Sequence, residues 1–267
     1  MWEKGMLPKG KVIVVTGASS GLGKALADAL EVDNTVIRIS RSLSNSPITF
    51  SCDVGCLESV EQVFKEIKDR YGHIDILVNS AGVGLSGATE HINEHFIRRV
   101  FDTNYFGTLF TCQQALKLMD KGSRIVNIGS LAGIAPMPFR AIYNSSKAAV
   151  HSLSYSIKME VAPLGIEVST IVLGAVATEF ASNREKLTHC KSRYALHEQA
   201  VDNFMQSVKD DKKMPLAKAV AKIKKILCKK HLKAFYLLDT KSRLIYLLTF
   251  LFPNFSLNAS YRLMIRK

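Results

Sequence analysis

The sequence predicts an α/β fold in which helices cover both faces of a doubly wound parallel sheet, within a single domain. Short apolar runs rich in β-branched residues alternate along the chain with longer segments of helical periodicity. Strands that alternate with helices form right-handed βαβ units, and such units build parallel sheets buried on both faces. The length of 267 residues, with 47% hydrophobic and 22% charged residues, suits one large globular domain of this kind.

The predicted strands are short β-branched runs such as KVIVVTG and TVIRIS. They cover residues 11–17, 35–40, 48–54, 74–82, 123–130 and 166–174. Helices are expected between them because apolar residues recur at helical spacing over about 22–30, 59–72, 92–119 and 143–163. In the second of these helices, the spacing places Val60, Val63, Phe64 and Ile67 on one face.

The first strand leads into a glycine-rich turn, TGASSGLG (residues 16–23), which opens the first helix. Its glycines, Gly17, Gly21 and Gly23, permit a tight turn. They also let backbone N–H groups approach a pyrophosphate at the positive end of the helix. An ordinary glycine-rich turn would fit the same residues, but the position directly after the first strand favours a dinucleotide site.

The end of the second strand indicates which nicotinamide cofactor such a site would take. An acidic residue there binds the ribose 2′-hydroxyl of NAD, whereas an arginine accommodates the 2′-phosphate of NADP. The sequence reads RISRS, with Ser40 and Arg41 and no carboxylate. We therefore predict NADP(H), with Ser19 as a second phosphate contact. The alternative is that Arg41 is a solvated loop charge.

The stretch YNSSK (143–147) places a tyrosine and a lysine four residues apart. On a helix these two side chains lie on one face. A neighbouring ammonium stabilises a phenolate, so Lys147 is expected to lower the pKa of Tyr143 and make it an acid and base near neutral pH. The pentapeptide alone is equally compatible with an ordinary amphipathic surface helix.

The order of these motifs resembles the classical short-chain dehydrogenase/reductase family over roughly residues 10–180. TGASSGLG resembles the cofactor loop of that family, and CDV places Asp53 where the family contacts adenine. NSAG (79–82) resembles its NNAG turn, with Ser80 in place of the second asparagine. Four residues match its catalytic tetrad: Asn104, Ser130, Tyr143 and Lys147.

The resemblance implies a Rossmann-like fold and an oxidoreductase that acts on CH–OH groups. Tyr143 would donate a proton to a carbonyl in reduction, or accept one from an alcohol in oxidation. Lys147 would bind the nicotinamide ribose, Ser130 would position the reacting oxygen, and Asn104 would hold a water in a proton relay. A non-catalytic dinucleotide-binding sensor is the alternative, although a sensor has no need of all four residues.

The resemblance also implies a set of cofactor contacts. Leu173 replaces the proline that usually follows the sixth strand, but Gly174 and Thr178 still match the family pattern. The implied contacts are Gly17, Ser19, Ser20, Gly21, Leu22, Gly23, Ser40, Arg41, Asp53, Val54, Asn79, Ala81, Gly82, Tyr143, Lys147, Val176 and Thr178. No metal site is predicted, because no cluster of cysteines and histidines has metal-ligand spacing.

Within the single domain of residues 1–267, we expect a cofactor-binding and catalytic core over about 10–180. A mostly helical substrate lid would follow over about 180–211, and a basic and apolar C-terminal extension over about 212–267. The expected substrate contacts are Leu131, Met137, Phe139 and Phe180, with Val83, Leu85 and Ile134 near the mouth of the pocket; about half of such residues would be core instead. An apolar pocket of this sort would hold a lipophilic ketone.

The C-terminal extension is similar to that of hydroxysteroid dehydrogenase-like and lipid-ketone reductase-like members of the family. This similarity makes a hydroxysteroid or ketosteroid the first candidate substrate. A phosphate-bearing membrane-lipid ketone is the second. The net charge of +13 supports an anionic partner, because residues 1–183 carry 17 basic and 17 acidic residues whereas residues 184–267 carry 19 and 6. No nucleic-acid motif accompanies this charge.

Two segments of the extension bear on membrane contact. Residues 216–235 form a basic amphipathic pattern that would either lie on an anionic membrane surface or pack on the domain as a solvated helix. The apolar run in residues 243–257 is too short to span a bilayer, which needs about 20 residues. We expect a cytoplasmic protein with reduced thiols, no signal peptide and possible peripheral membrane contact. We also expect a dimer or tetramer formed through the helices at 92–119 and 143–162.

Overall fold

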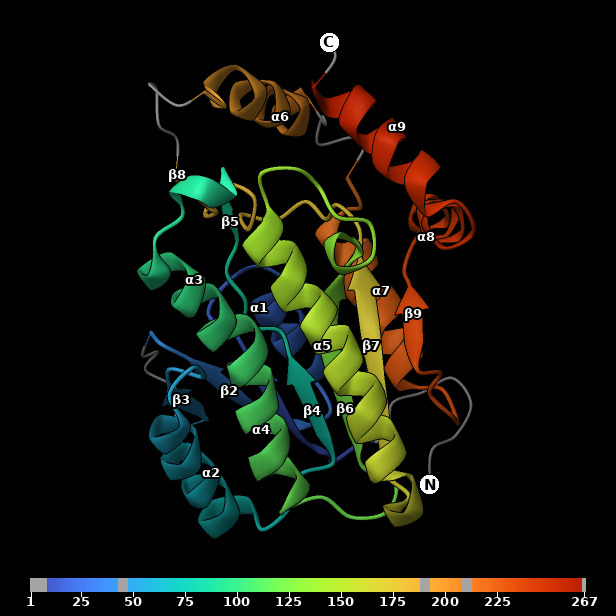
Figure 1. Cartoon of the computed structure of the whole chain (residues 1–267). Coiled ribbons are helices and arrows are strands. Elements are labelled where there is room, and N and C mark those ends of the chain that lie inside the picture. Colours follow the sequence, from blue (N-terminus) through green and yellow to red (C-terminus); the bar gives the residue numbers. More distant parts are fainter. Residues whose placement is uncertain (1–8, 43–47, 188–192, 208–212, 266–267) are drawn as a thin grey trace.

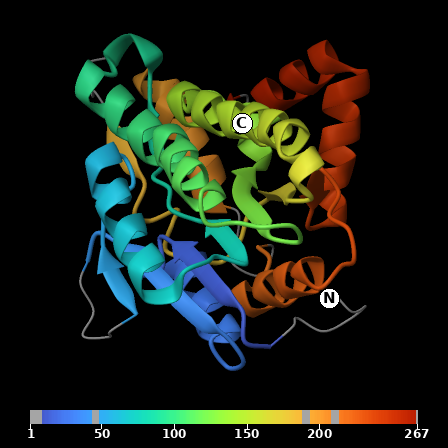
Figure 2. The same cartoon turned by 90° about the horizontal axis from the view of Figure 1, so that it is seen from below.

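The computed structural model describes residues 9–42, 48–187, 193–207 and 213–265. Its centre is a seven-stranded sheet in which every pairing is parallel, with the strand order β3-β2-β1-β4-β6-β7-β9. Helices cover both faces of this sheet (Figures 1 and 2). The strand order reverses its direction between β1 and β4, so the sheet is doubly wound and the predicted Rossmann-like fold is confirmed.

The strands of the main sheet are β1 Val12–Thr16, β2 Thr35–Ser40, β3 Thr49–Ser51, β4 Ile76–Asn79, β6 Arg124–Ser130, β7 Glu167–Leu173 and β9 Phe235–Leu237. A small separate sheet pairs β5 (Leu85–Gly87) with β8 (Glu185–Leu187). The helices are α1 Gly21–Leu30, α2 Leu57–Tyr71, α3 Glu94–Phe101, α4 Gly107–Leu116, α5 Ala141–Glu160, α6 Ala195–Ser207, α7 Leu216–Leu227, α8 Thr240–Leu251 and α9 Pro253–Ile265.

The alternation of side chains along the strands creates two hydrophobic cores, one on each face of the sheet. Successive residues of a strand point to opposite faces. In β1, Val12 and Val14 belong to the core that includes residues of α2, α4 and α5, whereas Ile13 and Val15 belong to the core that includes α1 and α7. The predicted apolar face of α2 is buried as expected. Both cores fix the ends of the strands, where the site lies.

The six predicted strands are all present, but the seventh, β9, is not apparent in the sequence because it is only three residues long. The helix predicted over 92–119 is divided into α3 and α4 by a π-helical turn over Asp102–Phe106. The described part of the predicted lid contains the short strand β8 as well as the helix α6. The C-terminal extension folds as three helices and an edge strand.

The basic helix α7 packs on the domain, so its apolar face does not lie on a membrane. Val220, Ile223 and Leu227 are buried in the core shared with α1. Lys224 Nζ donates a hydrogen bond of 2.9 Å to the main-chain oxygen of Ala29 in α1. In the same last turn of α7, the oxygen of Leu227 accepts a hydrogen bond of 2.5 Å from the buried Arg124 of β6. Of the two alternatives for this segment, the packed helix is correct.

The last two helices, α8 and α9, pack on each other, and α9 contacts the lid helix α6 (Figure 1). Asp239 caps α8 by accepting a hydrogen bond of 2.7 Å from the backbone N–H of Ser242. Large apolar side chains remain exposed on this helix pair, among them Leu247, Phe250, Leu251, Phe252, Phe255 and Leu263. Within the described residues, no helix combines the length and apolar character needed to cross a bilayer.

Candidate active site

The glycine-rich turn between β1 and α1 has the backbone conformation that only glycine adopts without strain. Gly17 and Gly21 have φ values of +66° and +53°. A Cβ atom on Gly23 would lie 2.3 Å from the main-chain oxygen of Gly17, and one on Gly17 would lie 2.7 Å from the Cα atom of Ala81. Ser19 and Ser20 are exposed beside the N-terminus of α1. This cradle fits a pyrophosphate, because no side chain stands between the backbone and a ligand.

Thr16 joins the end of β1 to the end of β4, where the expected NSAG turn begins. Its Oγ1 atom accepts hydrogen bonds of 3.1 Å from the backbone N–H groups of both Ser80 and Ala81. The side chain of Asn79 is buried and donates to Asn127 Oδ1 at 2.9 Å. Asn79 therefore supports the central sheet through its side chain, while the turn that follows it borders the glycine-rich cradle.

Asn104 lies in the π-helical turn that interrupts the helix between α3 and α4. Insertions of this kind occur frequently at functional sites. Its Oδ1 atom accepts a hydrogen bond of 2.8 Å from the N–H of Val83, and its Nδ2 atom donates to Ser146 Oγ at 3.0 Å. A Cβ atom on Gly82 would lie 3.3 Å from Asn104 Oδ1 and 3.6 Å from Lys147 Nζ. Gly82 therefore lies beside two members of the predicted tetrad.

Ser130 and Tyr143 are brought together by the end of β6 and the first turn of α5. Ser130 Oγ accepts a hydrogen bond of 3.2 Å from the N–H of Ala132, which orients the hydroxyl. Burial raises the pKa of Tyr143 above its ordinary value. The neighbouring side chain of Ser130 opposes that effect, as do the positive charges of Arg140 and Arg184.

Lys147 lies one helical turn after Tyr143, as predicted, and its Nζ atom donates a hydrogen bond of 3.0 Å to the oxygen of Ile128. Burial lowers the pKa of Lys147 to about 8. The pKa of Tyr143 is raised, and the cations that oppose the rise are Arg140 and Arg184. The lowering of this pKa by Lys147 stays a prediction of the sequence. The hydrogen bond to Ile128 ties the lysine of α5 to the main chain of β6.

The other predicted cofactor contacts at the ends of β2 and β3 differ in what their side chains contact. Asp53 is exposed and accepts a hydrogen bond of 3.0 Å from the N–H of Gly55. Val54 is buried and packs closely against Gly107, where an added Cβ atom would lie 2.7 Å from Val54 Cγ2. The side chain of Val54 therefore belongs to the core. Arg41 is exposed, whereas Ser40 is buried and its hydroxyl donates to the oxygen of Ser42 at 2.8 Å.

The loop after β7 approaches the cradle from the opposite side. Thr178 Cβ would lie 3.9 Å from a Cβ atom on Gly21. Val176 forms an isolated parallel bridge with Met214, and the N–H of Ala177 donates to the oxygen of Met214 at 3.0 Å. These contacts fix the loop even though Leu173 replaces a proline in it. Leu22 is half-buried and packs on the core beneath α1.

The predicted substrate residues divide between the site and the core. The ring centroid of Phe180 lies 5.8 Å from that of Tyr143, so Phe180 borders the reacting group. Phe139 lines a pocket beside β5. Leu131 and Met137 are half-buried in the loop between β6 and α5. Leu85, by contrast, is buried in a small core with residues of α3, so it is not available to a substrate.

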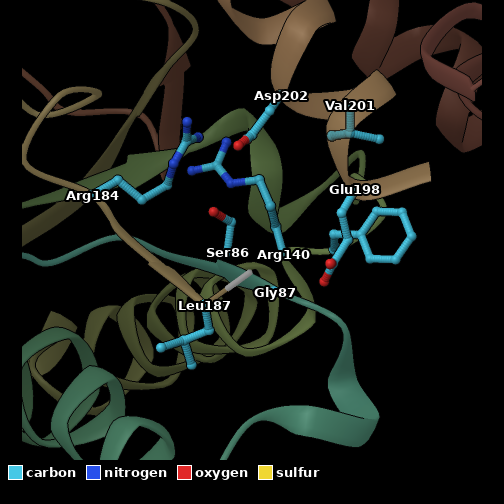
Figure 3. Close-up of a pocket in the computed structure, with 9 residues that line it drawn as sticks. Ser86, Gly87, Arg140, Arg184, Leu187, Glu198, Val201 and Asp202 are labelled. Carbon is cyan, nitrogen blue, oxygen red and sulfur yellow. The ribbon is translucent and has the colours of Figure 1, made fainter. Parts of the chain in front are cut away.

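Two arginines that the sequence analysis did not single out lie in the same region. The guanidinium carbon of Arg140 lies 4.7 Å from the ring centroid of Tyr143, and Arg184 borders the same pocket as Arg140 (Figure 3). A signal for Arg140 was present, because it is the one charged residue in the otherwise apolar loop LAGIAPMPFRA. Arg184 follows the lid turn and carries no comparable signal.

Comparison with known proteins agrees with this geometry. The family model for short chain dehydrogenase matches residues 11–188. A 3-ketodihydrosphingosine reductase of Bacteroides thetaiotaomicron is 35% identical over 207 residues, which cover 74% of this chain and 75% of the relative. An uncharacterized oxidoreductase of Schizosaccharomyces pombe is 38% identical over 182 residues, 64% of this chain and 62% of that protein, so the chain spans under two thirds of its length.

The overall structure is similar to a solved short-chain dehydrogenase from Streptomyces avermitilis. The TM-score is 0.81 at 28% sequence identity, and the match covers 94% of this chain and 96% of that one. The family model, these relatives and the grouping of Ser130, Tyr143, Lys147 and Asn104 lead to the same result. The chain belongs to the short-chain dehydrogenase family.

Proposed function

We propose that this protein is an NADP(H)-dependent oxidoreductase that interconverts a ketone and a secondary alcohol on a lipophilic substrate. The observation that carries the proposal is that Ser130, at the end of β6, lies beside the buried phenol of Tyr143, at the start of α5, close enough to act on its pKa. A buried phenol beside a serine hydroxyl is a positioned proton donor. The glycine-rich cradle that would hold the dinucleotide lies at the same end of the sheet, where the carboxyl ends of β1, β4 and β6 meet.

In ketone reduction, Tyr143 donates its proton to the carbonyl oxygen as that oxygen becomes an alcohol. The raised pKa of the phenol keeps it protonated at neutral pH, which suits this direction. Ser130 holds the carbonyl oxygen near the phenol by a hydrogen bond, so the reacting atoms are positioned before transfer. Lys147 and Asn104 lie behind Tyr143 and supply the polar path by which the phenol recovers a proton. The bound nicotinamide supplies the hydride.

The end of β2 supports NADP(H) over NAD(H). The position after β2 holds the exposed Arg41 and no carboxylate that would bind a ribose 2′-hydroxyl. Ser40 does not supply a free hydroxyl, because it donates to the main chain. Arg41, with Ser19 across the cradle, is therefore the residue that we assign to the 2′-phosphate.

A long-chain ketone of lipid type is the substrate class with the best support. The relative from Bacteroides thetaiotaomicron is named as a reductase of such a ketone. The apolar side chains of Phe180, beside Tyr143, and Phe139, in the neighbouring pocket, favour a hydrophobic body on the substrate. A steroid stays a prediction of the sequence, and a phosphate-bearing membrane-lipid ketone stays the alternative.

We also propose that α8 and α9 form a membrane-contacting surface. Phe250, Phe252 and Phe255 are more than half exposed on this helix pair, at 72%, 57% and 63%. The two helices themselves carry Lys241, Arg243 and Arg262 and no acidic residue, so the charge on this helix pair is complementary to anionic lipid. Because α9 contacts the lid helix α6, a substrate drawn from the membrane would reach the site beside the lid.

A second copy of this chain is the proposed partner for the outer face of α4 and α5. Phe106, Tyr155 and Met159 are exposed there, at 39%, 38% and 71%. Exposed large apolar residues on adjoining helices are typical of subunit interfaces. The expected assembly is a dimer or tetramer, which sedimentation equilibrium of the purified protein would detect.

NADPH oxidation by the purified protein tests the catalytic proposal. The panel contains long-chain keto-lipids and ketosteroids, with NADH in parallel. We expect turnover of a long-chain ketone with NADPH and a much higher KM for NADH. Preference for NADH would show that Arg41 does not bind a phosphate. Binding of NADPH with no turnover of any ketone would favour the dinucleotide-binding sensor.

A further inference from the structure

The pocket beside Tyr143 contains two buried arginines that have no ion-pair partner in the part of the chain that the structure describes. Arg140 and Arg184 are 6% and 8% exposed, and the Nε atom of each is buried without a hydrogen-bond acceptor. The nearest acceptor of Arg140 is the sulfur of Met137, 4.0 Å from Nη1, which is a weak partner. Burying a charge without a partner is costly, so such an arrangement in a folded protein indicates a ligand of opposite charge.

Both arginines are held in place by the small sheet of β5 and β8. Arg184 directly precedes β8, and the N–H of the next residue, Glu185, donates to the oxygen of Gly84 at 3.1 Å. A Cβ atom on Gly84 would lie 3.1 Å from Arg184 Cγ, so this glycine lets the arginine stem lie against the backbone. Across the pocket, the N–H of Gly87 donates to the oxygen of Phe139 at 2.8 Å. These contacts fix the backbone segments that carry Arg140 and Arg184 on either side of the pocket.

The backbone immediately before Arg140 is strained. Phe139 has a φ value of +57°, a region that residues with a Cβ atom rarely adopt. Strained residues persist where the surrounding structure holds them, and they cluster at functional sites. The guanidinium carbon of Arg140, the next residue, lies 4.7 Å from the ring centroid of Tyr143. In Figure 3 the side chains of Arg140 and Arg184 reach into the same pocket.

The acidic residues that face the pocket have other partners. Glu198 on α6 accepts a hydrogen bond of 2.6 Å from the N–H of Ala88. Asp202, one turn later, pairs with Lys186 Nζ at 2.9 Å, and its charge acts on Arg140 only at longer range. Burial and the repulsion from Arg184 lower the pKa of Arg140, to about 10. Neither arginine therefore forms a direct ion pair with a carboxylate among the described residues.

We propose that Arg140 and Arg184 form a binding site for an oxyanion, a carboxylate or a phosphate, carried by the ketone substrate close to its reacting carbonyl. This inference rests on the proposed function, because it names the substrate class of the same site. Guanidinium groups offer planar forks of donors that match both anions. The apolar residues Phe139, Phe180 and Leu187 would then contact the rest of the substrate.

The first test compares a medium-chain keto acid with its methyl ester, each reduced at saturating NADPH. The two compounds differ in charge and little else. We expect a higher kcat/KM for the acid in the wild type. Arg184→Met should lower the acid-to-ester ratio by roughly tenfold or more, the effect of losing a charge-assisted hydrogen bond.

Arg193→Met is the matched control, since Arg193 belongs to the same segment but is exposed and pairs with Glu90 at 2.5 Å. This variant should keep the wild-type ratio. If Arg184→Met does not fold, Arg184→Lys retains the charge without the fork of donors and should lose part of the preference. A wild-type preference for the ester, or a ratio unchanged in both Arg184 variants, would overturn the proposal.

A binding measurement separates this site from the proposed function. Inorganic phosphate and sodium acetate are titrated against the Tm of the NADP⁺-saturated protein, because a ligand that binds only the folded state raises Tm. The wild type should respond to one of the two anions, which identifies the group, and Arg184→Met should not respond. A shift that survives in the variant, or no shift with either anion, contradicts the site. If the shift depends on Arg184 but no ketone is reduced, the proposed function fails and the anion site stands.

Discussion

The Nζ atom of Lys147 donates a hydrogen bond of 3.0 Å to the main-chain oxygen of Ile128, so the ammonium of α5 is anchored within β6. The lysine is 6% exposed, and burial lowers its pKa to about 8 from the ordinary 10.5. Folding therefore disfavours the charged form of Lys147. The hydrogen bond to Ile128 orients the ammonium but does not remove this cost. The cost of burying that charge has a measurable dependence on pH.

Lys147→Met should change how stability depends on pH. Below about pH 8 the folded wild type bears the full cost of the buried charge. Between pH 8 and 10.5 the unfolded chain binds more protons than the folded one, so the wild type gains stability relative to the variant as pH rises. The gain across this window is on the order of 3 kcal/mol. Urea unfolding at pH 7 to 10 measures it, with Lys158→Met as the control on the same helix. A difference that stays constant with pH would contradict the buried charge.

Gly23→Ala should weaken NADPH binding by at least about tenfold, because a Cβ atom there would lie 2.3 Å from the oxygen of Gly17 and would displace the cradle. Fluorescence titration of NADPH measures the Kd. Gly72→Ala is the control: Gly72 has a φ value of +75° with no atom within 4 Å of an added Cβ. That variant should lose about 1 kcal/mol of stability and no nucleotide affinity. Equal affinity in the Gly23 variant would show that the cradle does not hold the nucleotide.

Sedimentation with lipid vesicles tests the surface formed by α8 and α9. Binding to anionic vesicles should be strong at low salt and should fade as salt is added, because charge and apolar contact act together. Phe250→Ser combined with Phe255→Ser should reduce binding by at least about tenfold, given the apolar area removed. Val32→Ser is the control, since Val32 is 82% exposed on another part of the surface. No binding to anionic vesicles at low salt would exclude this surface.

The fold was predictable because its signals are local. The alternation of apolar residues in β1 and the spacing of Val60, Val63, Phe64 and Ile67 in α2 follow directly from strand and helix geometry. The glycine cradle was predictable because Gly17 and Gly21 adopt φ values that other residues avoid. The strand β9 was not predictable from the sequence. It has only three residues, which is too short for an alternation of side chains to be visible, and its strand conformation depends on pairing with β7.

The charges around Tyr143 were less predictable. The i, i+4 spacing correctly placed Lys147 on the same side of α5, but spacing alone does not give the direction in which an ammonium points. Arg184 comes near Arg140 only because β8 pairs with β5 across about a hundred residues of chain. The basic pattern of α7 likewise did not reveal that its apolar face meets α1 rather than a membrane.

Replacement of Tyr143 by phenylalanine is the most direct test of the account, because it removes one oxygen and leaves the ring in contact with Phe180 and Arg140. Steady-state kcat for NADPH-dependent ketone reduction should fall by about 10²–10⁴-fold, the usual contribution of a positioned proton donor. NADPH affinity and Tm should stay close to wild type. Tyr155→Phe, a half-exposed tyrosine on the same helix, should retain full activity. Undiminished kcat in Tyr143→Phe would contradict the proposal that this tyrosine transfers the proton.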